Sequence, residues 1–311
     1  MSEVNFESYF DKPPQKKTTK TAPATKAISA AEPEKEETGE FVLTNENYYS
    51  RQANRLYMSV SQYKGFLSCE AAALAELNGE YEREEKEVFL VGNYLHAWAQ
   101  GPEYLDRFVE NNPEIISSKG ATKGELKAPF KVADKMIAAL QGDQKVMFYL
   151  QGEKELPINA MICGVPWKGK LDVLNDKLNY ILDIKTAQSI TDFKYVPAIG
   201  GYASFIEQYN YMLQAAIYCE MERVAAGREG HKDFYIAVVT KEDPPDHAII
   251  NLTDPVRIET ELQDVAARLP RIIKVKAGEL EPDRCECCRY CRRTKKVGEL
   301  VFYSDLREGK R

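Results

Sequence analysis

The sequence lacks the features that would place the protein in a membrane or outside the cell. It has no apolar run of the ~18 residues that a membrane-spanning helix needs, and its N-terminus lacks the charged, apolar and small-residue regions of a secretion signal. Its seven cysteines are an odd number, and four of them crowd between Cys285 and Cys291, unlike a secreted disulfide framework. We therefore expect a soluble, cytoplasmic protein with no membrane contact.

An excess of positive charge is also lacking. The formal net charge is -6, with 42 lysines and arginines against 48 aspartates and glutamates. This balance argues against a protein that coats nucleic acid unselectively, although a local basic groove can still bind phosphates. The chain of 311 residues is 44% hydrophobic, which suffices for the core of one large domain or two small ones.

The beginning of the chain has too few apolar side chains to build a core. Residues 1–45 are rich in Lys, Thr, Ala, Pro and Glu, and this composition predicts a disordered N-terminal tail. Phe6, Tyr9 and Phe10 have helical spacing and could dock on a partner, although a chance cluster of aromatics is the simpler explanation. The remaining residues, 46–311, are predicted to form a single folded domain.

Periodicity predicts a domain that mixes helices and strands. Helices are predicted at 85–99, from Ser204 to Ala226, and from Pro255 onward, where Pro270 should kink or end the helix. Strands are predicted at 155–163, 165–173, 180–185, 234–240 and 247–252.

The stretch 168–188 places acidic and basic side chains on two neighbouring predicted strands. Side chains alternate across a strand, so Asp183 and Lys185 share one face while Ile184 points to the other. Asp172 lies on the preceding strand. If the two strands form a hairpin, the carboxylates of both strands can meet.

The two carboxylates face each other only in one register of this hairpin. Asp172 comes opposite Asp183 if the hairpin is centred between Lys177 and Leu178, with a loop of roughly six residues at 175–180. Two such carboxylates repel unless a proton or cation lies between them, and Mg2+ prefers oxygen ligands. The nearby lysine could then polarise an attacking water or stabilise charge on a phosphate. The alternative is an edge hairpin whose charges are merely solvated.

Other candidate residues lie on predicted helices and one strand. Gly92 and His96 are four residues apart, and a glycine inside a helix suggests the close approach of a backbone or a ligand. Gln214 and Tyr218 share one face of their helix. Taken singly, a histidine such as His96 more often has a structural role, and a pair such as Gln214 and Tyr218 more often lies on the solvated side of its helix. Upstream of the hairpin, Glu153 or Glu155 could add a third carboxylate to this site, and the sequence does not choose between them.

A cysteine-rich basic segment, 284–296, closes the predicted domain. Three of its thiols have regular spacing, at Cys285, Cys288 and Cys291. They suit a metal ion or an iron-sulfur cluster whose fourth ligand could be Cys69. Alternatively, the four local cysteines, with Cys287, hold Zn2+, or all of them are reduced and unliganded. The segment also carries positive charges that would meet phosphates, at Arg284, Arg289, Arg292, Arg293, Lys295 and Lys296.

Taken together, these residues resemble the PD-(D/E)xK nuclease superfamily. The likeness is strongest to its RecB/RecE branch and to the phage and prophage proteins described as exodeoxyribonuclease VIII. It covers about residues 57–297 and does not cover the tail. It rests on an ordered set of motifs: Ser59-Val-Ser61 with Phe66-Leu67-Ser68-Cys69, Gly92 to His96, Asp172, Asp183-Ile184-Lys185, Gln214 to Tyr218, and the C-terminal cysteines.

The resemblance implies a fold and a site. The fold is of the α/β class, with a mixed central sheet flanked by helices. The implied metal ligands are His96, Asp172, Asp183 and the carbonyl of Ile184, and Lys185 is the implied catalytic lysine. The implied catalytic set also includes residues that orient active-site groups and DNA, at Gln214 and Tyr218.

The resemblance also implies an activity. It predicts a deoxyribonuclease dependent on Mg2+ or Mn2+, acting as an exonuclease on double-stranded DNA ends in phage or prophage recombination, in the cytoplasm of a bacterial host. A [4Fe-4S] cluster is the implied ligand of the cysteines, ahead of Zn2+. A single-strand annealing recombinase could bind through the N-terminal tail. The alternatives are an endonuclease or a single-strand-specific nuclease with the same site, or a non-catalytic DNA-binding or scaffold protein.

Two departures from the family pattern stand out. Leu171 replaces the proline that gives the superfamily motif its name, as it does in many members. The spacing of the C-terminal cysteines is shorter at its last step than in the iron-sulfur pattern of the branch.

Overall fold

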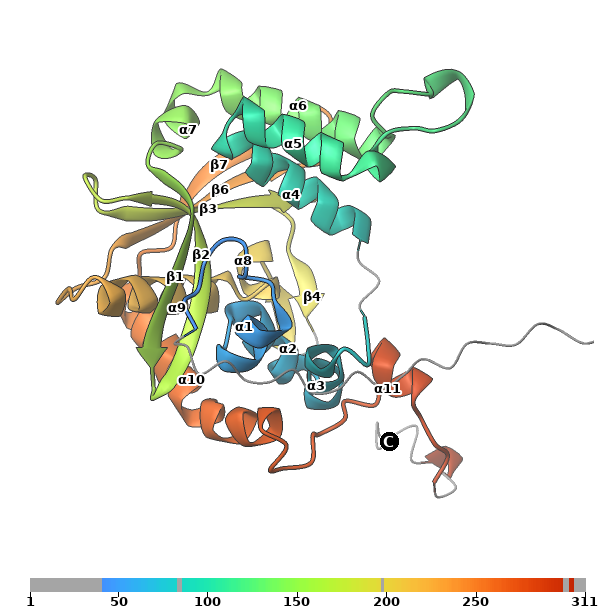
Figure 1. Cartoon of the computed structure of the whole chain (residues 1–311), viewed down its shortest axis with the longest axis vertical. Helices are drawn as coiled ribbons and strands as arrows, with labels where there is room; N and C mark the ends of the chain where they lie inside the picture. Colours follow the sequence, from blue (N-terminus) through green and yellow to red (C-terminus); the bar gives the residue numbers. More distant parts are fainter. Residues whose placement is uncertain (1–40, 83–85, 197–198, 299–301, 305–311) are drawn as a thin grey trace, which may run out of the picture. The chain divides into compact units, whose positions relative to one another are not determined.

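A five-stranded mixed sheet lies at the centre of the fold (Figure 1). Its order is β1-β2-β3-β6-β7, in which β3 and β6 are parallel and the other three pairs are antiparallel. The predicted mixed α/β class is therefore confirmed. The strands are β1 Glu153–Ile162, β2 Val165–Asn175, β3 Tyr180–Ala187, β6 Asp233–Thr240 and β7 His247–Asn251.

The computed structural model describes residues 41–82, 86–196, 199–298 and 302–304. The predicted tail at 1–45 therefore falls outside the described residues except for its last five, and its disorder stays a prediction.

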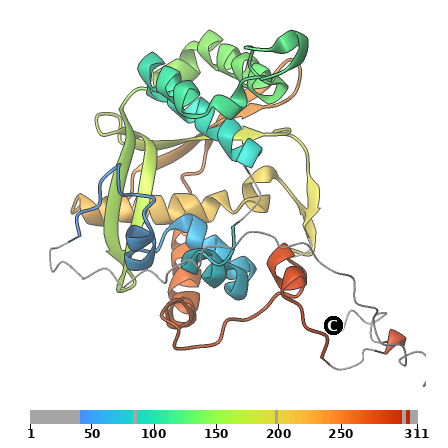
Figure 2. The ribbon, with the colours of Figure 1, turned by 45° about the vertical axis from the view of Figure 1, so that its right-hand side comes forward.

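Helices cover both faces of the sheet (Figure 2). One face packs against α4 Lys86–Gln100, α5 Pro102–Asn111, α6 Ala128–Gly142 and α7 Gln144–Tyr149. The other face packs against α9, which is backed by further helices, so the central strands are covered on both sides. These helices are α9 Tyr211–Ala225, α10 Pro255–Lys276, α2 Val60–Ser68 and α3 Glu70–Asn78.

The central hairpin has the predicted register. Val173 pairs with Leu182, and Asn175 pairs with Tyr180, so the hairpin is centred between Lys177 and Leu178. The loop is two residues shorter than the predicted six. Asn175 and Tyr180 pair with each other in the ladder, so only residues 176–179 form the turn.

Buried charges fix this turn to the end of α9. Lys232 is fully buried, and its Nζ lies 2.8 Å from Oδ1 of Asp176 in the turn and 3.9 Å from Oε1 of Glu222 on α9. Arg228 bridges the same two carboxylates at 2.8 and 2.9 Å. A buried charge is tolerated only with such partners, so the network holds the hairpin in one position.

The helix predicted from Ser204 to Ala226 is interrupted. A short helix, α8 Phe205–Gln208, ends before Asn210, whose φ of 51° lies in the left-handed region. That conformation cannot continue a right-handed helix, so α9 starts anew at Tyr211.

Proline 270 does not end its helix. The chain remains helical from Pro255 to Lys276, with Pro270 inside α10. Leu269 and Ile272 are buried on either side of the proline, and this packing outweighs the missing backbone hydrogen bond. Within the described part of the chain, neither α10 nor any other helix is both long and apolar enough to span a membrane.

Close contact between β2 and α9 depends on one glycine. A Cβ added to Gly169, on β2, would lie 2.4 Å from Cε of Met221 and 3.1 Å from Cε1 of Tyr218. Both distances are shorter than van der Waals contact. The methionine end can move aside, but the tyrosine ring is held between β2 and Phe234. Glycine therefore lets α9 bring Tyr218 against the sheet.

We expect Gly169→Ala to lower the free energy of unfolding by about 1–3 kcal/mol, because the added methyl group overpacks this contact. Urea denaturation measures the change. Gly142→Ala is the matched control, because among the described residues no atom beyond its chain neighbours and its own helix backbone lies within 4 Å of a Cβ at that exposed position. This variant should leave stability unchanged or slightly higher. Equal stability of Gly169→Ala and the unmodified protein would contradict the packing argument.

Candidate active site

Three side chains converge where α4, β1 and β2 meet. Nδ1 of His96 lies 3.3 Å from Oε1 of Glu155 and 3.3 Å from Oδ1 of Asp172. Oε2 of Glu155 lies 3.2 Å from Nζ of Lys170. Ligand-type atoms of the histidine and the two acids all lie within 4.8 Å of one another, so the three could share one metal ion.

Glu155 reaches this group through an unusual backbone conformation. Its φ is 49°, in the left-handed region that non-glycine residues rarely adopt. Its neighbours on β1 pair with the neighbours of Asp172 on β2, but Glu155 itself stays out of the ladder. Of the two candidate glutamates, the structure thus brings Glu155 into the group. Glu153 pairs with Leu174 of β2 in the regular ladder, and it is exposed.

A second group of contacts joins Asp172 to β3. The ladder between β2 and β3 stops at Val173, and Oδ2 of Asp172 instead accepts a hydrogen bond of 2.7 Å from the backbone N–H of Ile184. Asp183 and Lys185 share one face of β3 as predicted, with Lys185 Nζ 2.5 Å from Oδ2 of Asp183 as an ion pair. The predicted pair of aspartates therefore meets at the point where β2 and β3 separate.

Gln214 on α9 orients Asp183. Its Nε2 donates a hydrogen bond of 2.8 Å to Oδ1 of Asp183. Tyr218 lies one turn further along α9, packed on Gly169, and burial raises its pKa well above the usual value, with a smaller contribution from Asp183. The two helix residues predicted from the sequence thus come from α9 to the same side of the sheet.

The charges of the site shift its pKa values. Burial lowers the pKa of His96, but the charge and hydrogen bonds of Asp172, with Glu155, raise it to about 10. Burial raises the pKa of Asp183 to about 6, opposed by Lys185. Burial lowers the pKa of Lys185, but Asp183 raises it above its usual value. The protonated histidine and lysine therefore offset the repulsion between carboxylates.

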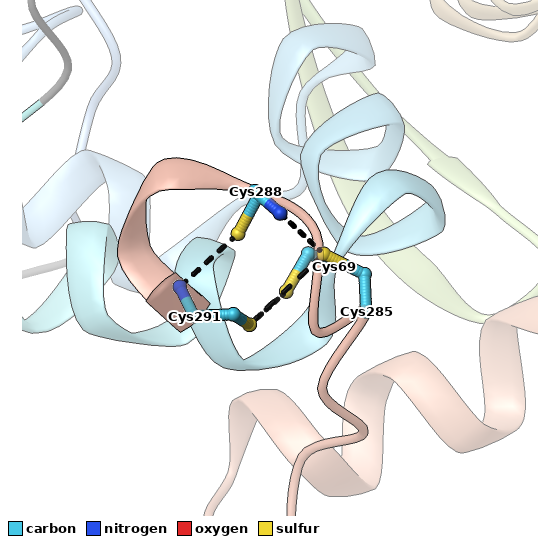
Figure 3. A group of neighbouring side chains, drawn as sticks. All are labelled: Cys69, Cys285, Cys288 and Cys291. Carbon is cyan, nitrogen blue, oxygen red and sulfur yellow. Dashed lines mark hydrogen bonds between the residues drawn. The ribbon is translucent and has the colours of Figure 1, made fainter. Parts of the chain in front are cut away.

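Four cysteines form a separate group. Figure 3 shows Cys69, at the junction of α2 and α3, facing three cysteines of the C-terminal segment, and the four Sγ atoms lie within 4.8 Å of one another. Cys69 and Cys291 are 3.5 Å apart and Cys285 and Cys291 4.0 Å apart, measured between sulfurs. Cys287 is exposed and outside the group, so the alternative of four local cysteines is wrong.

Backbone N–H groups favour thiolates in this group. The N–H of Cys288 donates to Sγ of Cys285, and the N–H of Cys291 donates to Sγ of Cys288, both at 3.3 Å. Burial raises the pKa of Cys285, but the backbone N–H groups of Cys287 and Cys288 lower it to about 6. Burial raises the pKa of Cys288, and burial with the neighbouring Cys69 raises the pKa of Cys291 to about 12, so Cys285 is the thiol of the C-terminal segment that ionises first. Thiolates are the form that binds soft metal ions, and the closeness of the four sulfurs fits a metal.

Comparison with known families decides the assignment. Residues 59–294 match the family described as a PDDEXK-like domain of unknown function (DUF3799). The chain belongs to this PDDEXK-like family. The match spans most of the chain and almost coincides with the 57–297 range of the predicted resemblance, so membership of the PD-(D/E)xK superfamily is confirmed. The RecB/RecE branch stays a prediction.

One solved structure is similar to this chain over nearly its whole length. The crystal structure of a protein from Eubacterium rectale, described as a "putative exonuclease", is 38% identical to this PDDEXK-like chain, with a TM-score of 0.79. The match covers 87% of this chain and 100% of that one. The crystal structure of SSO0001 is 16% identical over 74% of this chain and 92% of its own, and its TM-score of 0.27 supports no argument. No curated protein matches the chain.

The sequence did not reveal every residue of the PDDEXK-like site. Lys64, on α2, donates a hydrogen bond of 2.8 Å to the carbonyl of Tyr209, and its Nζ lies 5.5 Å from the centroid of the Tyr211 ring. Lys185 lies 5.4 Å from the same ring centroid. No spacing in the sequence links Lys64 to β3, because only the packing of α2 brings them together.

Gly92 does not have the close neighbour that its place in α4 suggested. Among the described residues, no atom lies within 4 Å of a Cβ built there. The buried side chains of α4 at Val91, Tyr94 and Leu95 point to the core, which turns Gly92 toward the side that carries His96.

The predicted DNA-binding residues differ in their surroundings. The guanidinium of Arg284 pairs with Glu286 and donates to the carbonyl of Cys291 at 2.9 Å, so it braces the cysteine segment itself. The other predicted residues lie in or after α11 Arg289–Arg293, and all of them are exposed, at Arg289, Arg292, Arg293, Lys295 and Lys296.

A divalent cation fits the acidic group. Oxygen ligands predominate there, because two of its three residues are carboxylates. Carboxylate oxygens with one imidazole suit Mg2+ or Mn2+. Asp183 itself lies outside the three-residue group, so its part as a ligand stays a prediction.

We expect Glu155→Gln to weaken Mn2+ binding by about tenfold or more, because the amide keeps the shape of the side chain but loses the charge. Isothermal titration of the protein with Mn2+ measures the affinity. Glu153→Gln, two residues earlier on the same strand, is the matched control and should bind as the unmodified protein does. Equal affinities for both variants would exclude Glu155 from the metal site.

Proposed function

We propose that this protein is a Mg2+-dependent DNA exonuclease that acts on double-stranded ends in phage or prophage recombination. The observation that carries the nuclease assignment is the convergence of His96, Glu155 and Asp172 with the Asp183–Lys185 pair, in a chain of the PDDEXK-like family. The exonuclease direction is supported by the description of the Eubacterium rectale protein. The recombination role is supported by the predicted resemblance alone.

The proposed metal ligands are His96, Glu155 and Asp172, joined by Asp183 and the carbonyl of Ile184. A divalent ion held there would polarise the phosphodiester and lower the pKa of an attacking water. The residues of the chain prepare the site for it. The Ile184 N–H fixes Asp172, and Gln214 fixes Asp183, so the acidic oxygens do not rotate away.

Lys185 supplies the positive charge of the proposed reaction. Asp183 keeps it protonated, and the ion pair holds its Nζ at the acidic group. A fixed ammonium group in a partly enclosed site stabilises the charge that develops on a phosphate oxygen, and it needs no rearrangement during the reaction. Lys64 adds a second positive charge near Tyr211, with its Nζ 5.5 Å from the centroid of that ring.

We expect Lys185→Ala to reduce hydrolysis of linear duplex DNA in Mg2+ by about 10²–10³-fold or more, because it removes charge stabilisation in the transition state. Release of label from end-labelled linear DNA measures the rate. Lys177→Ala, an exposed lysine in the turn of the same hairpin, is the matched control and should keep full activity.

Two further arms of this experiment separate the alternatives. Full activity of Lys185→Ala, with circular dichroism unchanged, would contradict the mechanism. Covalently closed circular DNA is the second substrate, because an exonuclease spares it. Digestion of the circle would contradict the exonuclease direction while leaving the hydrolytic site in place.

The four-cysteine group is the proposed second metal centre. Four thiolates around one tetrahedral ion with bonds of about 2.3 Å lie ~3.8 Å apart, close to the separations of 3.5 and 4.0 Å. This spacing supports a single Zn2+, whereas the resemblance supports a [4Fe-4S] cluster. In either form the metal would join the α2–α3 junction to the C-terminal segment.

We expect anaerobically purified protein to contain metal that Cys288→Ser removes and Cys287→Ser retains, because only Cys288 belongs to the group. Elemental analysis for zinc and iron, with an assay for acid-labile sulfide, measures both the amount and the kind. Equal metal content in the two variants, or none in the unmodified protein, would contradict this centre.

Two partners are proposed, DNA and a protein. DNA is the substrate, and the exposed basic residues after Cys291 are the proposed phosphate contacts. A single-strand annealing recombinase, bound through the tail at 1–45, is the proposed protein partner.

A further inference from the structure

Exposed aromatic rings gather on a two-stranded ribbon beside α8. The ribbon consists of β4 Lys194–Val196 and β5 Gly201–Ala203, and Figure 1 shows β4 in yellow near α8. Tyr195 and Tyr202 pair across it, 57% and 74% exposed, with ring centroids 5.8 Å apart. Phe193, before the ribbon, is 64% exposed, and Tyr209, after α8, is 55% exposed. Such large rings are usually covered, so their exposure together requires an explanation.

The ring surface, defined here as Phe193, Tyr195, Tyr202 and Tyr209, is held in place. The ribbon continues directly into α8, and Nε2 of Gln208 donates a hydrogen bond of 2.8 Å to the carbonyl of Ala203. Phe205 of α8 is buried against the sheet. A small pocket lies between the ribbon and the segment after β3, and its lining includes Lys194, Tyr209 and Gln188.

One member of this surface, Tyr209, is linked to the proposed catalytic lysine. The ring of Tyr209 lies 5.7 Å from that of Tyr211, with only 32° between their planes. The Tyr211 ring in turn lies 5.4 Å from Nζ of Lys185, and Lys64 binds the carbonyl of Tyr209. The exposed ring of Tyr209 is therefore connected, through Tyr211, to the acidic site, and the ribbon with Tyr195 and Tyr202 lies beside the helix that precedes it.

We propose that the ring surface stacks on unpaired nucleobases of the strand that is being cut. The proposal rests on the nuclease function proposed above. A strand whose phosphodiester lies at Lys185 must place its next nucleotides on the neighbouring surface, because they are joined covalently to the nucleotide that is being cut. Aromatic side chains beside lysines are the usual platform for single strands, since every base offers a flat face.

The same contacts favour unpaired nucleotides over duplex DNA as the ligand of the ring surface. Bases inside a duplex already stack on one another, so only unpaired nucleotides can use these rings. The lysines at 64, 185 and 194 match the phosphates of such a strand. The substrate therefore includes an unpaired segment next to the cut, either a single strand or a frayed duplex end.

A binding experiment tests this without any cleavage. The full-length protein, without added divalent cation, is titrated into fluorescently labelled oligothymidine of about 12 nucleotides and into a blunt hairpin duplex. The double variant Tyr195→Ala and Tyr202→Ala should bind the oligothymidine about 5- to 150-fold more weakly for each stacked base lost. It should bind the blunt duplex nearly as the unmodified protein does.

Two variants control for folding and for non-specific loss of an aromatic ring. Tyr195→Phe with Tyr202→Phe keeps the rings and should retain binding. Tyr104→Ala removes a half-exposed tyrosine of α5, on the opposite face of the sheet, and should also retain it.

Three outcomes would overturn the proposal. Binding of the alanine variant within about twofold of the unmodified protein is one, and equal loss in the phenylalanine variant is another. The third is a change of oligomeric state by light scattering with unchanged DNA binding, which would make this surface an interface between copies of the chain. None depends on hydrolysis, so a failure of the nuclease assignment would be seen separately, in the Lys185→Ala experiment.

Discussion

Repulsion between closely spaced carboxylates is the constraint on which this structure depends. Glu155, Asp172 and Asp183 come from three strands and are partly or wholly removed from water, where like charges repel strongly. The positive charges of His96 and Lys185 offset that repulsion. Each residue contacts a carboxylate only if its own element, α4 or β3, packs correctly. The fold of the sheet and the position of α4 are therefore coupled to the electrostatics of one site.

The backbone makes this crowding sterically possible at two places. β2 leaves β3 after Val173, which frees Asp172 to accept the Ile184 N–H instead of lying in a regular ladder. On the other side of β2, Glu155 adopts a left-handed conformation and leaves its own ladder. The register still sets Glu155 and Asp183 opposite Asp172 on its two neighbouring strands. The irregular geometry at this point frees Asp172 and Glu155 from the ladder, as expected at a functional site.

Local patterns in the sequence were enough to predict the hairpin and the helix residues. Strand alternation placed Asp183 and Lys185 on one face, and the sequence identified the one register of the hairpin that brings Asp172 opposite Asp183. Helical spacing placed Gln214 and Tyr218 together. These predictions succeeded because each depends on residues close in sequence. The choice of Glu155 depended on one φ angle, and Lys64 on the docking of α2, and neither is encoded in a local pattern. The alternative that Pro270 ends its helix failed for the same reason, because burial of its neighbours keeps the chain helical to Lys276, and the kink stays a prediction.

The helix α2 connects the two candidate metal sites. It begins at Ser59, whose side chain caps it, and ends at Cys69, whose sulfur faces the C-terminal cysteines. Between them Lys64 reaches Tyr209 and the ring beside Lys185. Arg271 reinforces the same region, because it binds Glu70 of α3 through two hydrogen bonds of 2.8 Å and Asp283 of the C-terminal segment at 2.9 Å. A metal that joins the cysteines would therefore also fix the C-terminal end of α2. The same helix places Lys64 beside Tyr211 and the acidic site.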